Sequence, residues 1–227
     1  MSGRVVATYT YPDERGRVLL RKRRFDPKDF RMQARKAENC VWVRPLVLTA
    51  RYPKAAAYFD GLLFNLRLLL EDPPRLALTE GEKDAQWLTA AGLPTLSHWG
   101  GAQHFTAEQA NRFRSYRGRL ILVADKDPAG AADVLVRYRR LLAVGVPARR
   151  VRIVRAAGGR RNKDAADHIA AGYGPDEFVP VDMTRLHALA AAAPPPGRAG
   201  RGYDPAVWAT DLSTWRPTVL TPSGEAR

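Results

Sequence analysis

Residues 120–130, which read LILVADKDPAG, decide the fold of this chain. The five apolar residues that open this stretch are typical of a strand buried on both faces, as in a parallel sheet. Pro128 follows at a position that suits the first turn of a helix. The pattern therefore predicts a strand at residues 120–124 that leads through a short acidic turn into a helix at residues 128–143.

The alternation of strand and helix extends to both sides of this segment. Residues 75–79 predict a short apolar strand, and residues 82–91 predict a helix that ends at Gly92. The other expected elements are strands at residues 94–97 and 151–154, and helices at residues 107–116 and 165–171. Such alternation implies βαβ units, and therefore an α/β fold with a mostly parallel sheet flanked by helices.

The residues before this region form a smaller, basic part of the chain. Residues 5–11 and 18–25 predict the two strands of a β-hairpin, and residues 26–57 predict irregular structure with short strands. The second hairpin strand contains four consecutive cationic residues, Arg21, Lys22, Arg23 and Arg24. They suit either a solvated edge strand protected by its charge or a strip that contacts phosphates.

Three regions are therefore expected along the chain. Residues 1–72 form a basic, β-rich N-terminal region, and residues 73–182 form the α/β domain. Residues 183–227 form the remnant of a helix, a linker rich in proline and glycine, and an irregular tail. The apolar stretch at residues 61–70 is too short to cross a bilayer and predicts a buried helix or a strand-to-helix junction.

Charge and cysteine content limit the class of protein. The chain has 37 basic and 23 acidic residues, and its net charge of +14 favours DNA or RNA as partners through phosphate contacts. A membrane surface or simple solubility would explain the same excess. The single cysteine, Cys40, excludes an internal disulfide and a four-cysteine zinc site, so we expect a cytoplasmic protein. The first residues lack the apolar segment of a signal peptide, and we expect no membrane partner.

Acidic residues follow three of the expected strands. Glu80 comes directly after the first strand, Asp125 and Asp127 follow the third, and Asp164 comes after the fourth. Because ligands of parallel sheets sit beyond the carboxyl ends of the strands, these carboxylates are expected to converge there and to repel one another unless a cation intervenes. Hard oxygen ligands select Mg²⁺ or Mn²⁺. The sequence therefore predicts a metal site suited to phosphoryl or nucleotidyl transfer.

Most of these acidic residues also have a purely structural explanation. Asp127 and Asp164 precede predicted helices, where each would cap the first turn. Asp84, in the first turn of a predicted helix, would complement the helix dipole. Glu80 and Asp125 fit this explanation less well, because each directly follows an apolar strand.

The order of these motifs resembles the Toprim superfamily over residues 73–182. The acidic-glycine motif of that superfamily is similar to Glu80-Gly81, and its D-x-D motif is similar to residues 125–127. The run EGEKDA at residues 80–85 and the glycine pair at residues 100–101 resemble, in particular, primase-like Toprim proteins of bacteria, phages and plasmids.

The resemblance implies roles for individual residues. Glu80, Asp125 and Asp127 would be catalytic and would bind Mg²⁺ or Mn²⁺, and Glu80 would also activate or orient the reacting hydroxyl. Asp164 would be an auxiliary metal ligand. The supporting residues would be Gly81, Asp84, Gly130 and Lys163. The residues expected to bind nucleic acid are Arg21, Lys22, Arg23, Arg24, Arg160 and Arg161.

Three functions agree with these expectations. The leading one is a DNA primase-like nucleotidyltransferase that uses nucleoside triphosphates and works with a helicase or another replication protein. The alternative is a Toprim nuclease that cleaves DNA or RNA, and a further alternative is a non-catalytic nucleic-acid-binding adaptor of the replisome. The sequence departs from bacterial primases in lacking the cysteines of a zinc module, and from helicase-fused relatives in lacking a Walker motif.

Overall fold

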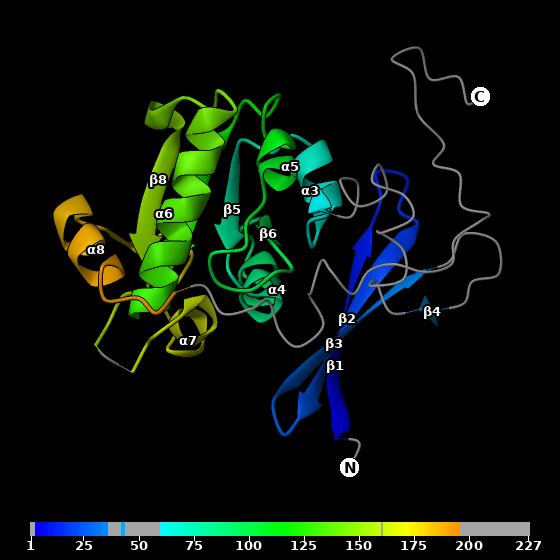
Figure 1. Ribbon diagram of the computed structural model, residues 1–227. Coiled ribbons are helices and arrows are strands. Elements are labelled where there is room, and N and C mark those ends of the chain that lie inside the picture. The colour runs from blue at the N-terminus through cyan, green and yellow to red at the C-terminus, as the bar shows by residue number, and fades with distance from the viewer. Residues whose placement is uncertain (1–2, 36–41, 44–59, 160, 196–227) are drawn as a thin grey trace.

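The computed structural model describes residues 3–35, 42–43, 60–159 and 161–195. Two β-sheets organise these residues, an antiparallel sheet near the N-terminus and a mostly parallel sheet formed by later strands. Figure 1 shows the antiparallel sheet beside the strands and helices of the larger sheet.

The N-terminal sheet has the order β1-β2-β3-β4. Its strands are β1 (Arg4–Pro12), β2 (Val18–Asp26), β3 (Asp29–Arg35) and β4 (Trp42–Val43). β1 and β2 form the predicted hairpin. β3 is more regular than expected, since it pairs with β2 along most of its length. In β3, Arg31 is exposed and Ala34 is buried. This pattern of exposed and buried residues is short and lies among many charged residues, so the sequence alone does not reveal the strand.

The larger sheet has the order β6-β5-β7-β8-β9. Its strands are β5 (Arg75–Thr79), β6 (Thr95–Ser97), β7 (Arg119–Ala124), β8 (Val151–Arg155) and β9 (Val179–Pro180). The first four of these run parallel, and β9 pairs antiparallel with β8. The predicted mostly parallel α/β sheet is confirmed. β9 was not foreseen, because two residues leave no periodic pattern.

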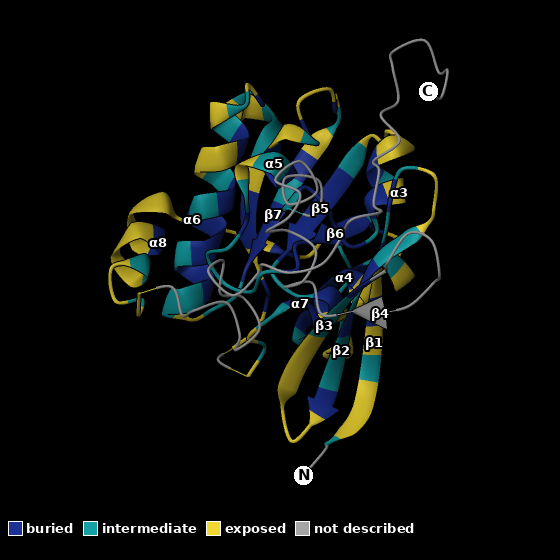
Figure 2. Cartoon of the chain, turned by 45° about the vertical axis from the view of Figure 1, so that its right-hand side comes forward, coloured by how far each residue is buried: buried dark blue, intermediate teal, exposed yellow. Residues whose placement is uncertain are grey.

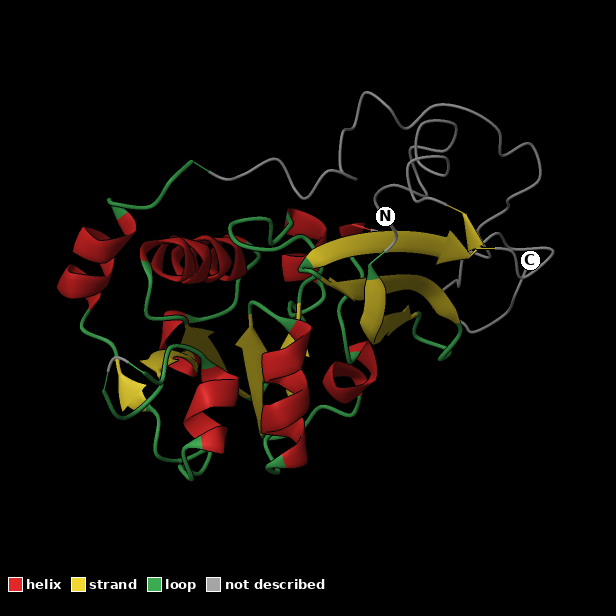
Figure 3. Ribbon diagram, turned by 90° about the horizontal axis from the view of Figure 1, so that it is seen from below, coloured by secondary structure: helices red, strands yellow, loops and turns green. Residues whose placement is uncertain are grey.

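Helices cover both faces of the larger sheet (Figure 3). α4 (Glu82–Ala90) and α7 (Ala165–Ala170) lie on one face. The other face carries α3 (Leu66–Leu70), α5 (Ala107–Asn111), α6 (Pro128–Ala143) and α8 (Met183–Ala190). A 3₁₀ turn at Ala148–Arg150 precedes β8. The adjacent residues Leu122 and Val123 of β7 belong to different apolar cores, one on each face, as the alternation of a strand requires.

Helix α5 is shorter than the sequence predicts. A capping box formed by Thr106 and Gln109 starts it as expected, but it ends at Asn111 instead of near Tyr116. Phe113 and Tyr116 are buried in the core, and the Tyr116 hydroxyl donates to the carbonyl of Pro73 at 2.7 Å. Tertiary packing therefore takes the place of the last helical turn.

A third apolar core joins the two sheets. Tyr9, Tyr11 and Leu20 of the N-terminal sheet pack with Phe64 and Trp99. Both tyrosine rings meet Phe64 edge-on, with ring centroids 5.9 Å apart. In Figure 2 the core strands of the larger sheet are buried, whereas β1 near the N-terminus is largely exposed. The two sheets therefore pack against each other near the turn of the β1–β2 hairpin.

Residues 61–70, which predict a buried helix or a strand-to-helix junction, contain an isolated bridge followed by a short helix, closer to the second alternative. Phe64 forms a bridge with Ser97 of β6, and α3 begins two residues later. Within the described ranges, no helix combines the length and apolar character needed to cross a membrane. Arg160 and the tail predicted beyond residue 195 lie outside the described residues.

Candidate functional site

The two leading acidic motifs meet where the larger sheet changes direction. Glu80 follows β5 and Asp125 follows β7, and these two strands are neighbours. From β5 the chain passes through α4 to β6 on one side, whereas from β7 it passes through α6 to β8 on the other. Neighbouring strands whose connections lead in opposite directions open a crevice at their carboxyl ends, where ligands of α/β sheets bind.

The carboxylates of Glu80 and Asp125 are half-buried, and this environment disfavours their charge. Burial, together with the charges of Asp133 and Asp127, raises the pKa of Glu80 to about 7. Burial and the charges of Glu80 and Asp84 together raise the pKa of Asp125 to about 8. The charges of acidic residues from other parts of the chain, Glu80 first among them, therefore contribute to the raised pKa of Asp125.

Asp84 connects the first acidic motif, which begins at Glu80, with residues 162–167, the third acidic segment, which contains Asp164. Asp84 is buried on α4, and its carboxylate accepts a hydrogen bond of 2.9 Å from the backbone N–H of Ala166 at the start of α7. Burial and the charge of Asp164 together raise the pKa of Asp84 to about 6. The helix-dipole explanation is therefore incomplete, because Asp84 also fixes α7 against α4.

Asp127 and Asp164 both cap helices, as the structural explanation expected. The Asp127 carboxylate accepts from the N–H of Gly130 at 2.8 Å, and that of Asp164 accepts from the N–H of Asp167 at 2.7 Å. A carboxylate has two oxygens and several acceptor positions, so capping by one oxygen leaves coordination by the other compatible with this geometry.

Glycine is required at the turn after the D-x-D motif. A Cβ on Gly130 would lie 2.5 Å from the Cβ of Asp125 and 3.1 Å from its backbone, closer than side chains tolerate. Gly130 thus lets the first turn of α6 pack directly against Asp125. Gly81 is more permissive, because its Cβ would meet only a side-chain oxygen of Asp84 at 3.1 Å.

The carboxylates that follow β5 and β7 are the candidate ligands for a divalent cation. In the described part of the chain, no three carboxylate, imidazole or thiol groups are grouped so that they could together hold a metal ion. The donor type nevertheless fits Mg²⁺ or Mn²⁺, since Glu80 and Asp125 are hard oxygen ligands in a setting where a cation would offset their repulsion. The carboxylates are thus electrostatically coupled but not assembled into a cage.

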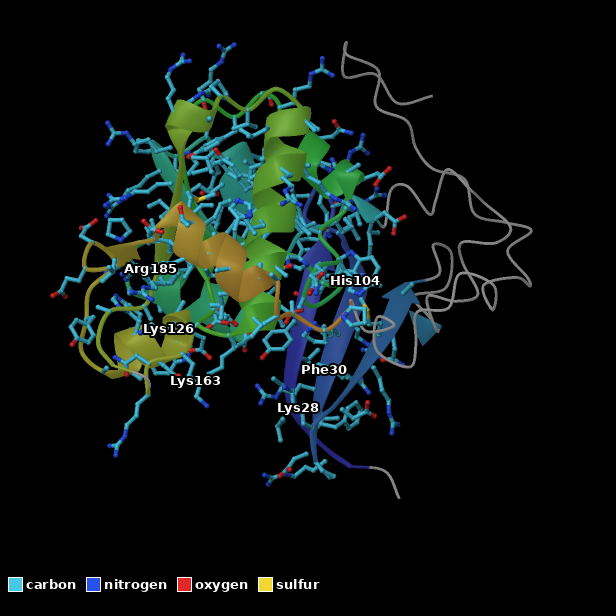
Figure 4. The ribbon with its side chains drawn as sticks, turned by 60° about the vertical axis from the view of Figure 1, so that its left-hand side comes forward. Lys28, Phe30, His104, Lys126, Lys163 and Arg185 are labelled. Atoms are coloured by element: carbon cyan, nitrogen blue, oxygen red, sulfur yellow. The ribbon has the colours of Figure 1, made fainter. Side chains whose placement is uncertain are left out.

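Lys126, between the two aspartates of the D-x-D motif, turns toward the third acidic segment (Figure 4). Its ammonium donates to the carbonyls of Gly158 at 3.0 Å and Gly159 at 3.2 Å, and its backbone N–H donates to the carbonyl of Lys163 at 2.9 Å. Burial and the charge of Arg155 lower the pKa of Lys126. Lys126 therefore holds the loop before α7 close to the D-x-D motif.

The basic residues expected to bind nucleic acid lie in different environments. Lys22 is buried, and its ammonium lies 2.9 Å from the Glu82 carboxylate and so already has an anionic partner. Arg21 donates to the Gln33 side chain at 2.7 Å. Arg24 lines a surface hollow together with Val6, Ala7, Phe25, Asp26 and Lys28. Arg161 is exposed.

His168 sits next to the third acidic segment but has a structural role. Its fully buried ring stacks on Phe178, with centroids 3.9 Å apart, and on Tyr173. Its Nδ1 accepts from the N–H of Ala157 at 3.0 Å, and its Nε2 lies 2.9 Å from the carbonyl of Gly174. Both ring nitrogens are therefore used within the fold.

A buried ion pair on α6, close to the ends of β5 and β7, was not predicted from the sequence. Asp133 and Arg137, one turn apart on α6, are both fully buried and form an ion pair of 2.7 Å. His98 Nε2 lies 3.3 Å from the other Asp133 oxygen, a long contact. Although burial raises it, Arg137 and His98 together hold the pKa of Asp133 well below its usual range. The signal in the sequence is that both charges fall on the apolar face of α6.

Comparison with known proteins adds information about the fold. No protein-family model matches the chain, and no curated protein matches it. Among solved structures, the Escherichia coli primase catalytic core has a TM-score of 0.55 at 20% identity, over 85% of this chain and 59% of that chain. A DNA primase domain from Pseudomonas aeruginosa has a TM-score of 0.54 at 18% identity, over 85% of this chain and 57% of that chain.

A third solved structure is the DnaG primase catalytic domain bound to ssDNA. It has a TM-score of 0.52 at 19% identity, over 80% of this chain and 61% of that chain. This chain has a primase-like fold. It spans less than two thirds of each of the three solved chains. Within the primase-like fold, Glu80 and Asp125 directly follow the neighbouring strands β5 and β7, where the larger sheet changes direction.

Proposed function

We propose that this chain is a DNA primase-like nucleotidyltransferase and that residues 73–182 form a Toprim domain. The observation that supports the proposal is that Glu80 and Asp125 directly follow the neighbouring parallel strands β5 and β7, where the larger sheet changes direction, within a primase-like fold. Two half-buried carboxylates with raised pKa values are an unfavourable pair unless a cation or a proton lies between them.

Each acidic residue has a role in this proposal. Glu80, Asp125 and Asp127 would hold Mg²⁺ or Mn²⁺, although their side chains are not grouped around one point in the described residues, and Asp164 would support them from the start of α7. The bound cation supplies neutralisation of phosphate charge during nucleotidyl transfer. Glu80, whose pKa is raised to about 7, is suited to accept a proton from the attacking hydroxyl near neutral pH. Lys126 and Gly130 hold the D-x-D turn in place.

Nucleic acid binds, in this proposal, to the basic residues of β2 and of the loop before α7. Arg24 and Lys28 line the same surface hollow, and Arg161 is exposed near the third acidic segment. Lys22 is left out, because its ammonium is paired with Glu82. Nucleoside triphosphates would be the substrates, and a helicase or another replication protein would be the partner.

The test is primer synthesis by the purified chain. The protein is incubated with single-stranded DNA templates, labelled nucleoside triphosphates and either Mg²⁺ or Mn²⁺. We expect short labelled oligonucleotides from the wild type, and a loss of about 100-fold or more from Asp125→Asn, since removing a group that stabilises transition-state charge has effects of this order. The matched control is Asp182→Asn, which removes an aspartate that caps α8.

The same incubation separates the other functions. Shortening of labelled DNA or RNA, lost in Asp125→Asn, would favour a Toprim nuclease with water as the nucleophile. Binding of nucleic acid that Asp125→Asn does not change, with neither extension nor shortening on any template, would favour a non-catalytic adaptor. Either result would reject the nucleotidyltransferase.

A further inference from the structure

The backbone pairing between β5 and β7 ends just before Glu80 and Asp125, the residues that follow these strands. Their last paired residues are Leu78 and Leu122. Beyond this pair, Thr79 of β5 pairs with β6, and Val123 of β7 pairs with β8 on the opposite side. In the described residues, no backbone pairing therefore joins the two strands over the last positions before the acidic motifs.

Arg137 spans this separation. Its guanidinium donates to the carbonyl of Leu78 at 2.5 Å through Nη1 and to the carbonyl of Val123 at 3.0 Å through Nη2. Leu78 lies two residues before Glu80, and Val123 lies two residues before Asp125. One planar side chain thus connects equivalent positions on the two strands that carry the acidic motifs. A guanidinium suits this geometry, since its donors form a rigid fork.

Asp133 fixes the orientation of that fork. Its carboxylate lies 2.7 Å from Arg137 Nε, and its other oxygen accepts a hydrogen bond of 2.7 Å from the N–H of Gln103. Both charged side chains have no exposed surface. Because a buried ion pair is expensive to desolvate and adds little to stability over an apolar pair, its presence below a site calls for another explanation.

We propose that Arg137 is a positioning residue that holds the carboxyl ends of β5 and β7 together and so sets the separation of Glu80 and Asp125. The inference rests on the proposed function in that the two carboxylates bind a divalent cation. The contacts of Arg137 that carry this inference are those to the two backbone carbonyls and to Asp133. Arg137 acts through the backbone of the two strands, with Asp133 as its anchor.

The test replaces the ion pair as a unit, because a single truncation would leave a buried charge without its partner. Asp133→Asn combined with Arg137→Met keeps the shapes and removes both charges. The control is Arg150→Met, which removes an arginine that donates to the Tyr116 carbonyl at 2.8 Å elsewhere in the fold. Arg137→Lys is the conservative variant, which keeps the charge opposite Asp133 but cannot reproduce the fork.

Two measurements are made on the folded proteins. Mn²⁺ affinity is measured by electron paramagnetic resonance, and amide hydrogen exchange is measured over residues 79–82 and 124–127. In the double variant we expect Mn²⁺ to bind about 10-fold more weakly or worse, the effect typical of residues that orient metal ligands. We also expect faster exchange in both segments, with both measurements unchanged in Arg150→Met and intermediate in Arg137→Lys.

The outcomes separate this inference from the proposed function. A double variant that loses thermal stability but keeps wild-type Mn²⁺ affinity, or keeps wild-type exchange in the two segments, would overturn the positioning role. If the wild type binds no Mn²⁺, the proposed function fails, and hydrogen exchange alone decides the role of Arg137. If the double variant does not fold, Arg137→Lys decides it by the same two measurements.

Discussion

The ammonium of Lys22 lies 2.9 Å from the carboxylate of Glu82, and this buried pair joins β2 of the N-terminal sheet to the first residue of α4. The same carboxylate oxygen accepts a hydrogen bond from the Tyr11 hydroxyl, and Lys22 also donates to the carbonyl of Trp99 at 3.2 Å. Because Glu82 lies two residues after Glu80, these contacts tie the N-terminal sheet to the acidic loop.

Removal of one partner of this pair should destabilise the protein strongly. In Lys22→Met the Glu82 carboxylate stays buried without its cation, and we expect a loss of about 3 kcal/mol or more in the free energy of unfolding. Chemical denaturation measures this loss. The control is Arg31→Ala, whose ion pair with Asp29 is more than half exposed and is worth about 1 kcal/mol at most. Equal losses in the two variants would contradict the role of the pair.

Thermal stability should depend on pH and on Mg²⁺ together. The pKa values of Glu80, Asp84 and Asp125 are raised to about 7, 6 and 8, above their unfolded values near 4. An acid with a raised pKa binds its proton more tightly in the folded state, so its contribution favours folding at low pH and is lost as the pH rises through the folded pKa. Without divalent metal, the unfolding temperature should therefore fall as the pH rises from about 4 to about 8.

Mg²⁺ should oppose this fall, because it binds the charged carboxylates and competes with protons. Differential scanning fluorimetry in Mg²⁺ and in EDTA should show the larger difference at the higher pH. Asp125→Asn should reduce both the pH dependence and the response to Mg²⁺. Superimposable pH profiles with and without Mg²⁺ would be evidence against a metal site at these carboxylates.

Gly130→Ala should disturb the site from within α6. The added Cβ would come within 2.5 Å of the Asp125 Cβ, so either the helix or the aspartate must shift, at a cost of about 1–3 kcal/mol. We expect a lower unfolding free energy together with weaker Mn²⁺ binding. Gly159→Ala is the control, since no atom lies within 4 Å of its added Cβ. A Gly130→Ala protein as stable as the control would show that the turn has room to adjust.

His168→Phe should destabilise the third acidic segment. Phenylalanine can keep the stacking on Phe178 and Tyr173, but it leaves the N–H of Ala157 and the carbonyl of Gly174 without their bonds to the imidazole. We expect a loss of about 1–3 kcal/mol in the unfolding free energy from these buried groups. His187→Ala, on the exposed side of α8, should change stability by less than about 0.5 kcal/mol. Equal stability of the two variants would show that stacking alone holds the ring.

The sequence by itself determined the order of the elements in the α/β region. The apolar run at residues 120–124, the glycine after α4 and the proline at the start of α6 are local signals, and the strands and helices they predict are present. It also indicated that Glu80 and Asp125 follow strands of a parallel sheet. Backbone propensity and periodicity act over a few residues, so they can be read without coordinates.

Only the tertiary structure decided which charged side chains are buried and connect these elements to one another. Arg137 looks in the sequence like one of three arginines in a helix, and Lys22 looks like one of four cations on a strand. The first is buried against two strand ends, and the second is buried against α4. The contacts of Lys22 with Glu82 and of Arg137 with Leu78 join residues about 60 positions apart, and their cost or benefit depends on burial and on partners that no local pattern contains.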